Sequence, residues 1–179
     1  QDLSNKGYQP MCSSSGRFVL SFNGEIYNHQ EIRQKFKDLN FNIEFKSSSD
    51  SETLLESIEI FGLEKTLKII QGMFAFSLWD KKKKKLIIAR DRLGEKPLYY
   101  CWINNSFVFA SEIKALKTFP NFKKDINFDA LDNYLKYGYV PIGSCIFSNV
   151  KKLEPGCFLS ISSDDFKEKI KTFWSITEV

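Results

Sequence analysis

The feature that most constrains this chain is a short apolar run that stops at an Asn-Gly pair just ahead of a helix-capping pattern. Residues 18–22 favour a strand, and Asn28 with Glu31 forms a capping-box pattern that predicts a helix directly after it. Asn23 and Gly24 lie between the two and are predicted to form the turn. A side-chain amide beside an unshielded backbone N–H can offer two hydrogen-bond donors to a developing oxyanion. The plainer alternative is that the pair serves only as a turn.

The spacing of apolar residues predicts a mixed helix and strand domain. Ser49 and Glu52 form a second capping-box pattern, which opens a helix that ends near Phe61 with Gly62 as its C-cap. Asn127 caps the last of the other helices, which are expected at 29–39, 64–70, 112–117 and 128–137. Strands are expected at 17–22, 41–45, 73–80, 86–91, 97–102, 107–110, 146–150 and 157–161. Antiparallel hairpins with helices gathered outside them predict an α+β layered fold.

The composition is typical of one globular domain without a membrane span. The 179 residues are 42% hydrophobic and 27% charged, and no apolar run reaches the ~18 residues of a transmembrane helix. Lysine supplies most of the net charge of +4, and the run Lys81–Lys85 is interpreted as a solvated hairpin turn, so neither nucleic acid nor membrane is expected as a partner. The cysteines lack metal-ligand spacing, which predicts no metal site and a reduced, cytoplasmic protein; they are Cys12, Cys101, Cys145 and Cys157.

The segment Phe22-Asn23-Gly24-Glu25-Ile26-Tyr27-Asn28 resembles the glutamine-binding motif of class II glutamine amidotransferases, in the form typical of glutamine-dependent asparagine synthetases. Further segments resemble the same family in the same order, at 49–55, 72–80, 89–100, 109–116, 137–141 and 152–156. The resemblance runs from about residue 2 to residue 174. It implies the N-terminal-nucleophile hydrolase fold, an αββα sandwich of two antiparallel sheets between helical layers, here expected to lack its first strands.

The resemblance also implies glutamine hydrolysis. In this family an N-terminal cysteine attacks the side-chain amide, and the ammonia passes to an aspartate that ATP activates in a synthetase domain. By resemblance, Asn23 and Gly24 are the catalytic oxyanion donors and contact the substrate. Glu25 matches a position that contacts bound glutamine, and Asp50 matches the carboxylate that binds the α-ammonium of glutamine. No cofactor is expected in this chain, whereas ATP and Mg²⁺ are expected in the synthetase domain.

The chain departs from the family pattern at both ends. Its first residues resemble a point well inside the pattern, so the opening Met-Cys-Gly and the arginine that binds the glutamine carboxylate are expected to be absent. Cys12 follows eleven residues and carries no free amine, so it is no substitute for the nucleophile. The expectation is a truncated, inactive fragment. Residues 1–125 would be the truncated glutaminase domain, and residues 126–179 its end and the start of the passage toward the synthetase domain.

Two other functions fit the same residues. The chain could be a non-catalytic module that binds glutamine, or it could belong to an amidotransferase with another acceptor, such as a surface sugar acid. The expected partners are glutamine and the C-terminal synthetase domain. Exposed strand edges are also expected to favour self-association into homo-oligomers.

Overall fold

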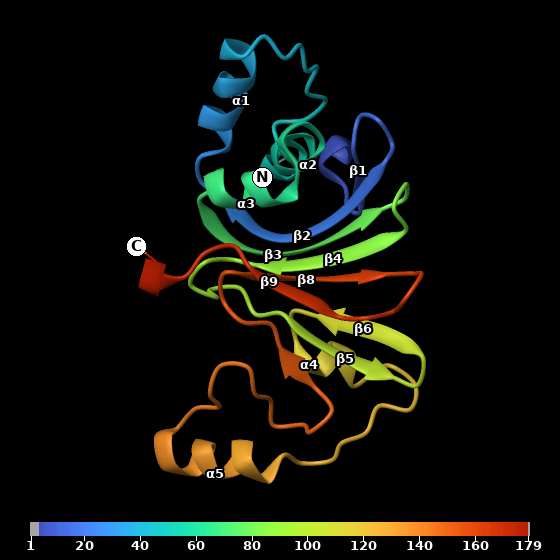
Figure 1. Ribbon diagram of the computed structural model, residues 1–179, viewed down its shortest axis with the longest axis vertical. Helices are drawn as coiled ribbons and strands as arrows, with labels where there is room; N and C mark the ends of the chain where they lie inside the picture. The colour runs from blue at the N-terminus through green and yellow to red at the C-terminus, as the bar shows by residue number, and fades with distance from the viewer. Residues whose placement is uncertain (1–3, 179) are drawn as a thin grey trace.

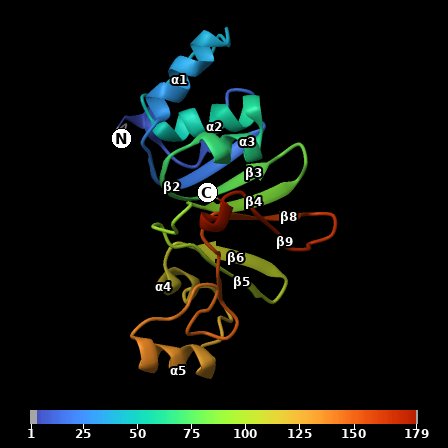
Figure 2. The same ribbon diagram turned by 60° about the vertical axis from the view of Figure 1, so that its left-hand side comes forward.

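The computed structural model describes residues 4–178 and places two sheets between helical layers (Figures 1 and 2). The large sheet is antiparallel, and its strands in spatial order are β1 (Met11–Cys12), β2 (Phe18–Ile26), β3 (Gly72–Asp80), β4 (Lys85–Arg90), β8 (Cys157–Ser162) and β9 (Lys169–Thr172). The small sheet is antiparallel too, in the order β6 (Ser106–Ala110), β5 (Tyr99–Ile103) and β7 (Lys151–Lys152). This arrangement confirms the expected α+β sandwich of two antiparallel sheets.

Helices lie on the outer face of each sheet. They are α1 (His29–Asp38), α2 (Asp50–Phe61), α3 (Leu63–Ile69), α4 (Ile113–Leu116) and α5 (Phe128–Tyr137), with short 3-10 turns η1 (Asn5–Gly7) and η2 (Ile176–Glu178). Helices α2 and α3 cover the large sheet, and α1 packs against α2 on the outside. Helix α4 covers the small sheet, and α5 lies beyond the small sheet at the bottom of Figure 1. Within residues 4–178, none of these helices has the length and apolar character needed to cross a lipid bilayer.

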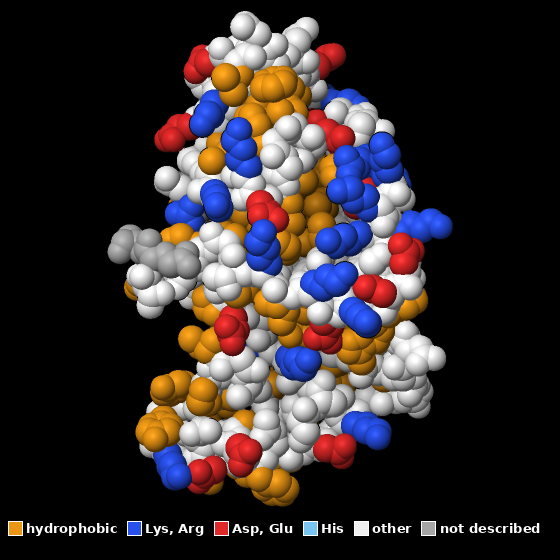
Figure 3. All heavy atoms as spheres, in the orientation of Figure 1, with side chains coloured by type: hydrophobic (Ala, Val, Ile, Leu, Met, Phe, Trp, Pro, Cys, Tyr) orange, Lys and Arg blue, Asp and Glu red, His pale blue; other side chains and the backbone are white. Residues whose placement is uncertain are grey.

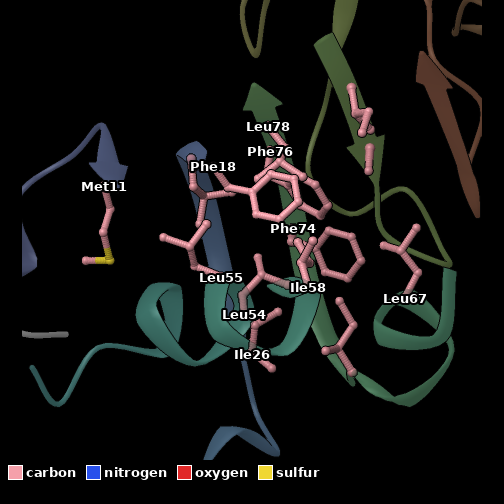
Figure 4. Packing of buried hydrophobic residues seen from close by; sticks show 14 of the residues in the cluster. Met11, Phe18, Ile26, Leu54, Leu55, Ile58, Leu67, Phe74, Phe76 and Leu78 are labelled. Atoms are coloured by element: carbon pink, nitrogen blue, oxygen red, sulfur yellow. The ribbon is translucent and has the colours of Figure 1, made fainter. Parts of the chain in front are cut away.

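Three apolar clusters fill the spaces between the layers. In the largest, Phe74 and Phe76 of β3 face Leu54 and Ile58 of α2 (Figure 4). The second lies between the sheets and consists of Ala75, Ile88, Leu98, Tyr100, Leu153, Cys157, Leu159 and Ile161. The third joins α4 to the small sheet and consists of Cys101, Ile103, Leu116, Cys145 and Val150. Burial of this apolar area is the main favourable term in folding, so the clusters fix the spacing of all the layers.

Two glycines let β2 and β3 approach each other closely near one end of the large sheet. A Cβ on Gly24 would lie 2.1 Å from the carbonyl oxygen of Met73. A Cβ on Gly72 would lie 2.0 Å from the carbonyl oxygen of Glu25. Any side chain at either position would push the strands apart, so the close approach of the two backbones requires glycine at both.

A fully buried carboxylate joins the two sheets at the end of β4. Asp91 is 0% exposed, and its carboxylate accepts hydrogen bonds of 2.9–3.2 Å from the backbone N–H groups of Phe74, Leu93, Glu95 and Lys96. The neighbouring Arg90 guanidinium donates to the carbonyl oxygens of Gly94, Lys96 and Leu153. Both charges are thus satisfied by backbone groups, as burial requires. Together they fix the path of the chain from the large sheet to the small one.

The predicted turn at Asn23 and Gly24 was wrong, because both residues lie inside β2, which continues to Ile26. Their local preference favours a turn, but Asn23 pairs with Ala75 of β3 and the ladder continues beyond it. Pairing across a sheet outweighs single-residue preference.

Asn28 is the N-cap residue of α1, as predicted, but the predicted side-chain cap was wrong. The Asn28 side chain makes no capping bond to α1; it donates to the carbonyl oxygen of Ile69 and accepts from the N–H of Gln71, each at 2.9 Å. The amide therefore links the start of α1 to the start of β3. A tertiary contact has replaced the local one that the sequence pattern predicts.

Two predicted strands are not strands. Residues 41–45 have no regular structure, and Phe41 and Phe45 instead place their rings 6.4 and 6.2 Å from the ring of Phe36. The apolar alternation of this segment thus reflects packing against α1. Residues 146–150 form only a single bridge, from Phe147 to Ile126.

The other predicted helices and strands lie close to their observed bounds, whereas strands β1, β7 and β9 were not predicted. Ser49 caps α2 by accepting from the N–H of Ser51, and Asn127 caps α5 by accepting from the N–H of Ala130. The predicted capping bond from Glu52 to the start of α2 was wrong, because the Glu52 carboxylate accepts from backbone N–H groups of the preceding loop. The division of the chain at residue 126 stays a prediction. Strands β8 and β9, which follow that position, lie in the large sheet.

The Asp91→Asn substitution should destabilise the fold. Oδ1 and Oδ2 each accept from two backbone N–H groups, and an amide would turn one acceptor into a donor facing two donors. We expect a loss of roughly 2–4 kcal/mol in the free energy of unfolding, measured by urea denaturation. The exposed Asp125→Asn should change that free energy by no more than about 0.5 kcal/mol. Equal midpoints for the two variants would contradict the role given to Asp91.

Candidate functional site

A cavity of about 320 Å³ lies beside β2 at the start of α2. Its lining residues are Gly7, Gln9, Phe22, Asn23, Gly24, Glu25, Ser49, Asp50, Ser51, Met73 and Lys96. It therefore brings together the four residues that the sequence analysis singled out, Asn23, Gly24, Glu25 and Asp50. Such a volume falls at the lower end of the range for small-molecule sites.

The Gly24 N–H is directed away from β3. Opposed residues of an antiparallel ladder alternate between hydrogen-bonded and non-hydrogen-bonded pairs. The Tyr27 N–H donates to the Gln71 carbonyl oxygen at 2.7 Å, and these two residues continue the β2–β3 register. The odd-numbered residues of β2 therefore bond to β3, and the even-numbered N–H groups, including that of Gly24, point to the opposite edge.

Side chains occupy the two N–H groups on either side of Gly24 along this edge. The Phe22 N–H donates to Oε1 of Gln9, and the Ile26 N–H donates to Oδ2 of Asp50 at 2.8 Å. Strand β1 pairs only with residues 19–20 of β2, so it does not cover the edge here. No side-chain hydrogen bond within residues 4–178 uses the Gly24 N–H, which leaves it as a donor at the cavity wall.

The Asn23 side-chain amide is held by a residue at the end of the small sheet. Its Nδ2 donates to Oγ of Ser111, just after β6, at 3.1 Å. Asn23 and Ser111 also line a second cavity of about 230 Å³ that reaches Ala110 and Phe109. A side-chain amide nitrogen has two hydrogens. Ser111 engages one of them, and the other is available to a molecule in the first cavity.

Asp50 occupies the first position of α2, with its carboxylate against the β2 edge. Oδ1 accepts from its neighbour Ser51 N–H at 2.9 Å, while Oδ2 accepts from the Ile26 N–H. A negative charge at a helix N-terminus is also favoured by the helix dipole. Asp50 is thus fixed between two elements and still has free lone pairs on both oxygens.

Arg33 of α1 fixes the loop that leads into Asp50. Its guanidinium donates to the carbonyl oxygens of Ser47 and Ser49, at 3.0 and 2.8 Å, and to Oγ1 of Thr53 at 2.6 Å. Burial lowers the pKa of Arg33, and the charge of Glu52, 3.8 Å away, opposes that shift. The arginine remains charged and positions the helix start without entering the cavity.

The charges around the cavity include one unpaired cation. Lys96 is half-buried, and we find no carboxylate within ion-pair distance of it among the described residues. Its backbone is held on both sides, since its N–H donates to Asp91 and its carbonyl oxygen accepts from Arg90. With Glu25 and Asp50 in the same wall, the lining residues include two acidic residues and one lysine.

Neither histidine nor cysteine contributes to the cavity wall that the structure describes. Burial lowers the pKa of His29, against the opposing charge of Asp50, so its imidazole is neutral near neutral pH. Cys12 is exposed on β1, and the other three cysteines are buried elsewhere. Across residues 4–178, no group of three His, Cys, Asp or Glu side chains could hold a metal ion.

Three residues of the two cavities were not predicted from the sequence, namely Gln9, Lys96 and Ser111. Ser111 is 88 positions from its partner Asn23, and no local pattern reports such a contact. Lys96 follows the Asp91 loop and enters the cavity wall only because that loop folds back. Both residues lie in segments on which the family resemblance rests, and that was the one available signal.

The chain is similar in sequence to known glutamine amidotransferases. A family model described as a glutamine amidotransferase domain matches residues 1–174. The chain is 34% identical over 183 residues to asparagine synthetase (glutamine-hydrolyzing) 2 of Bacillus subtilis, covering 99% of this chain and 24% of that protein. It is 39% identical over 163 residues to asparagine synthetase (glutamine-hydrolyzing) 1 of the same organism, covering 91% and 25%. The chain thus spans about a quarter of the length of these curated relatives.

Solved structures agree on the fold. The glutamine phosphoribosylpyrophosphate amidotransferase of B. subtilis superimposes with a TM-score of 0.68 at 20% identity, covering 96% of this chain and 33% of that one. The match of the family model over nearly the whole chain, together with relatives at 34% and 39% identity, shows that this chain belongs to the class II glutamine amidotransferase family.

Proposed function

We propose that this chain is the glutaminase domain of an asparagine synthetase, which binds glutamine and releases its side-chain nitrogen as ammonia. The observation that carries the proposal is the shared cavity of Asn23, Gly24, Glu25 and Asp50. The relatives named for glutamine hydrolysis support it. ATP, Mg²⁺ and the activated aspartate would belong to a separate synthetase domain of the same protein.

The donors at the end of β2 suit a tetrahedral oxyanion. When a thiolate attacks the glutamine amide, negative charge develops on the carbonyl oxygen and needs donors that are already in place. The Gly24 N–H is held by the rigid β2–β3 ladder, and the Asn23 amide is held by Ser111. Neither group must reorganise during the reaction, which is the source of this kind of stabilisation.

The charged groups of the cavity suit the two ends of a free amino acid. Asp50 binds the α-ammonium of glutamine, and Glu25 adds a second carboxylate to the same wall. The unpaired Lys96 binds the α-carboxylate. A site of this composition distinguishes glutamine from an amide inside a peptide, which carries neither charge.

A non-catalytic module that binds glutamine is the second candidate. It is favoured by one observation: none of the four cysteines lines the cavity within residues 4–178. The two candidates differ in one measurement on the full-length protein. Glutamate release from glutamine supports the glutaminase, and saturable glutamine binding without release supports the module.

The Asp50→Asn substitution should weaken glutamine binding. The amide oxygen can still accept from the Ile26 N–H, so the change removes charge while keeping the contact with β2. We expect the Kd for L-glutamine to rise roughly 30-fold, about 2 kcal/mol, by isothermal titration calorimetry on the 179-residue chain.

Asp129→Asn is the matched control, because Asp129 occupies the first turn of another helix and is exposed. It should bind glutamine like the unaltered chain. If Asp50→Asn also binds like the unaltered chain, Asp50 does not hold the ammonium group.

The Lys96→Met substitution tests the other end of the ligand. We expect the Kd for L-glutamine to rise by roughly 10- to 30-fold, since a charge-assisted contact is lost. Glutaminamide, which lacks the α-carboxylate, should bind equally well to both forms. Lys124→Met, at an exposed position, is the control. A loss of the same size for both ligands would mean that Lys96 supports the fold of the site instead of contacting the carboxylate.

The Asn23→Ala substitution should slow hydrolysis more than it weakens binding. Removal of one oxyanion donor costs about 10²- to 10³-fold in kcat, so kcat for glutamate release by the full-length enzyme should fall in that range while KM changes little. Ser21→Ala, on the same face of β2, should leave kcat unchanged. A large rise in KM at constant kcat would assign Asn23 to ground-state binding instead.

A further inference from the structure

Helix α5 and the loop after it carry an unusual concentration of exposed apolar side chains. Six of the sixteen exposed large apolar residues in the described part of the chain lie between positions 128 and 142. These are Phe128, Tyr134, Leu135, Tyr137, Tyr139 and Ile142, which we call the α5 surface. Hydrophobic side chains gather over α5 at the bottom of the space-filling view (Figure 3).

The apolar stripe of α5 faces away from the rest of the domain. Of the ten residues of α5, only Ala130 is buried, whereas Phe128 and Leu135 are 76% and 75% exposed. Phe128, Leu131 and Leu135 are spaced by three and four residues, which places them on one face. Short helices gain most of their stability from packing of an apolar face, and an exposed apolar patch marks an interaction site, so the stripe is a candidate interface.

The polar residues of α5 indicate what kind of partner this is. They include two aspartates and one lysine, and the lysine, Lys136, pairs with Asp132 at 2.7 Å. Helices that lie on membranes carry lysine and arginine on their polar face, and protein surfaces that bind nucleic acid are positively charged. The near-neutral polar side with exposed tyrosine, phenylalanine and leucine instead fits a protein interface.

The α5 surface lies next to the end of the family match, which favours a partner domain that is joined there. The family match ends at residue 174, and Trp174 and Ile176 line one cavity together with Ile142 of the α5 surface and Leu93. The B. subtilis relatives devote only about a quarter of their length to the matched region. A domain joined near residue 174 would be held beside this surface at a high effective concentration.

We propose that the α5 surface docks the ATP-dependent synthetase domain of the same protein, an inference that rests on the proposed function. The contact would bury the apolar stripe of α5 and the tyrosine-rich loop after it. Helix α5 follows β6 and α4 in the chain, and the N–H of Asn127 at its start donates to the carbonyl oxygen of Ile146. The contact would therefore place the synthetase domain on the side of the small sheet, next to which Ser111 holds Asn23.

Hydrogen exchange tests the contact directly. Backbone amides of residues 128–142 should exchange at least about tenfold more slowly in the full-length protein than in the 179-residue chain, while those of β3 should exchange alike in both. Equal exchange of residues 128–142 in the two proteins would overturn the proposal.

Substitution of the surface tests its role. The double variant Phe128→Ser with Leu135→Ser should remove the protection of residues 128–142 in the full-length protein and lower glutamine-dependent product formation relative to ammonia-dependent formation. The matched control is Leu39→Ser with Phe166→Ser, exposed apolar residues outside the α5 surface. Unchanged protection and an unchanged ratio in the α5 variant would overturn the proposal. Failure of the unaltered 179-residue chain to bind glutamine would instead count against the proposed function.

Discussion

The carboxylate of Asp91 is the interaction on which the rest of the structure depends. It holds four backbone N–H groups in a fully buried corner, and the adjacent Arg90 holds three carbonyl oxygens. Such buried charges are tolerable because both oxygens of Asp91 and the guanidinium of Arg90 are hydrogen-bonded to backbone groups. The same corner anchors β3 beneath the oxyanion donors and sets Lys96 in the cavity wall, so it determines both the fold and the site.

The site itself uses a single property of an antiparallel ladder. Alternate N–H groups along the edge of β2 point away from β3. The N–H groups of Phe22 and Ile26 donate to the side chains of Gln9 and Asp50, whereas the Gly24 N–H between them has no side-chain acceptor among the described residues. Glycine is required at that position because Met73 approaches so closely. The donor is therefore positioned by the same strand contact that excludes a side chain beside it.

Local chemistry explains which parts of the fold could be predicted from the sequence. Ser49 and Asn127 cap their helices, and Gly62 ends α2 with a positive φ of 79°, because these effects act over three or four residues. Predictions were wrong where a contact with a residue distant in sequence replaced the expected local structure. The Asn28 side chain bonds to residues 69 and 71 instead of capping α1, and the phenylalanines of 41–45 pack on α1 instead of forming a strand. Asn23 and Gly24 were predicted as site residues, but the turn predicted there was wrong because both residues pair with β3 and so lie within β2.

The sequence by itself determined the periodic helices, the hairpins and the ordered motifs that identify the family, since each is encoded in neighbouring residues. Only the tertiary structure decided that Gly24 offers its N–H at a free edge, that Ser111 holds Asn23 from 88 residues away, and that Lys96 joins the site. It also decided that the apolar stripe of α5 faces outward. These features depend on contacts between distant segments, and such contacts leave no periodic signal in the chain.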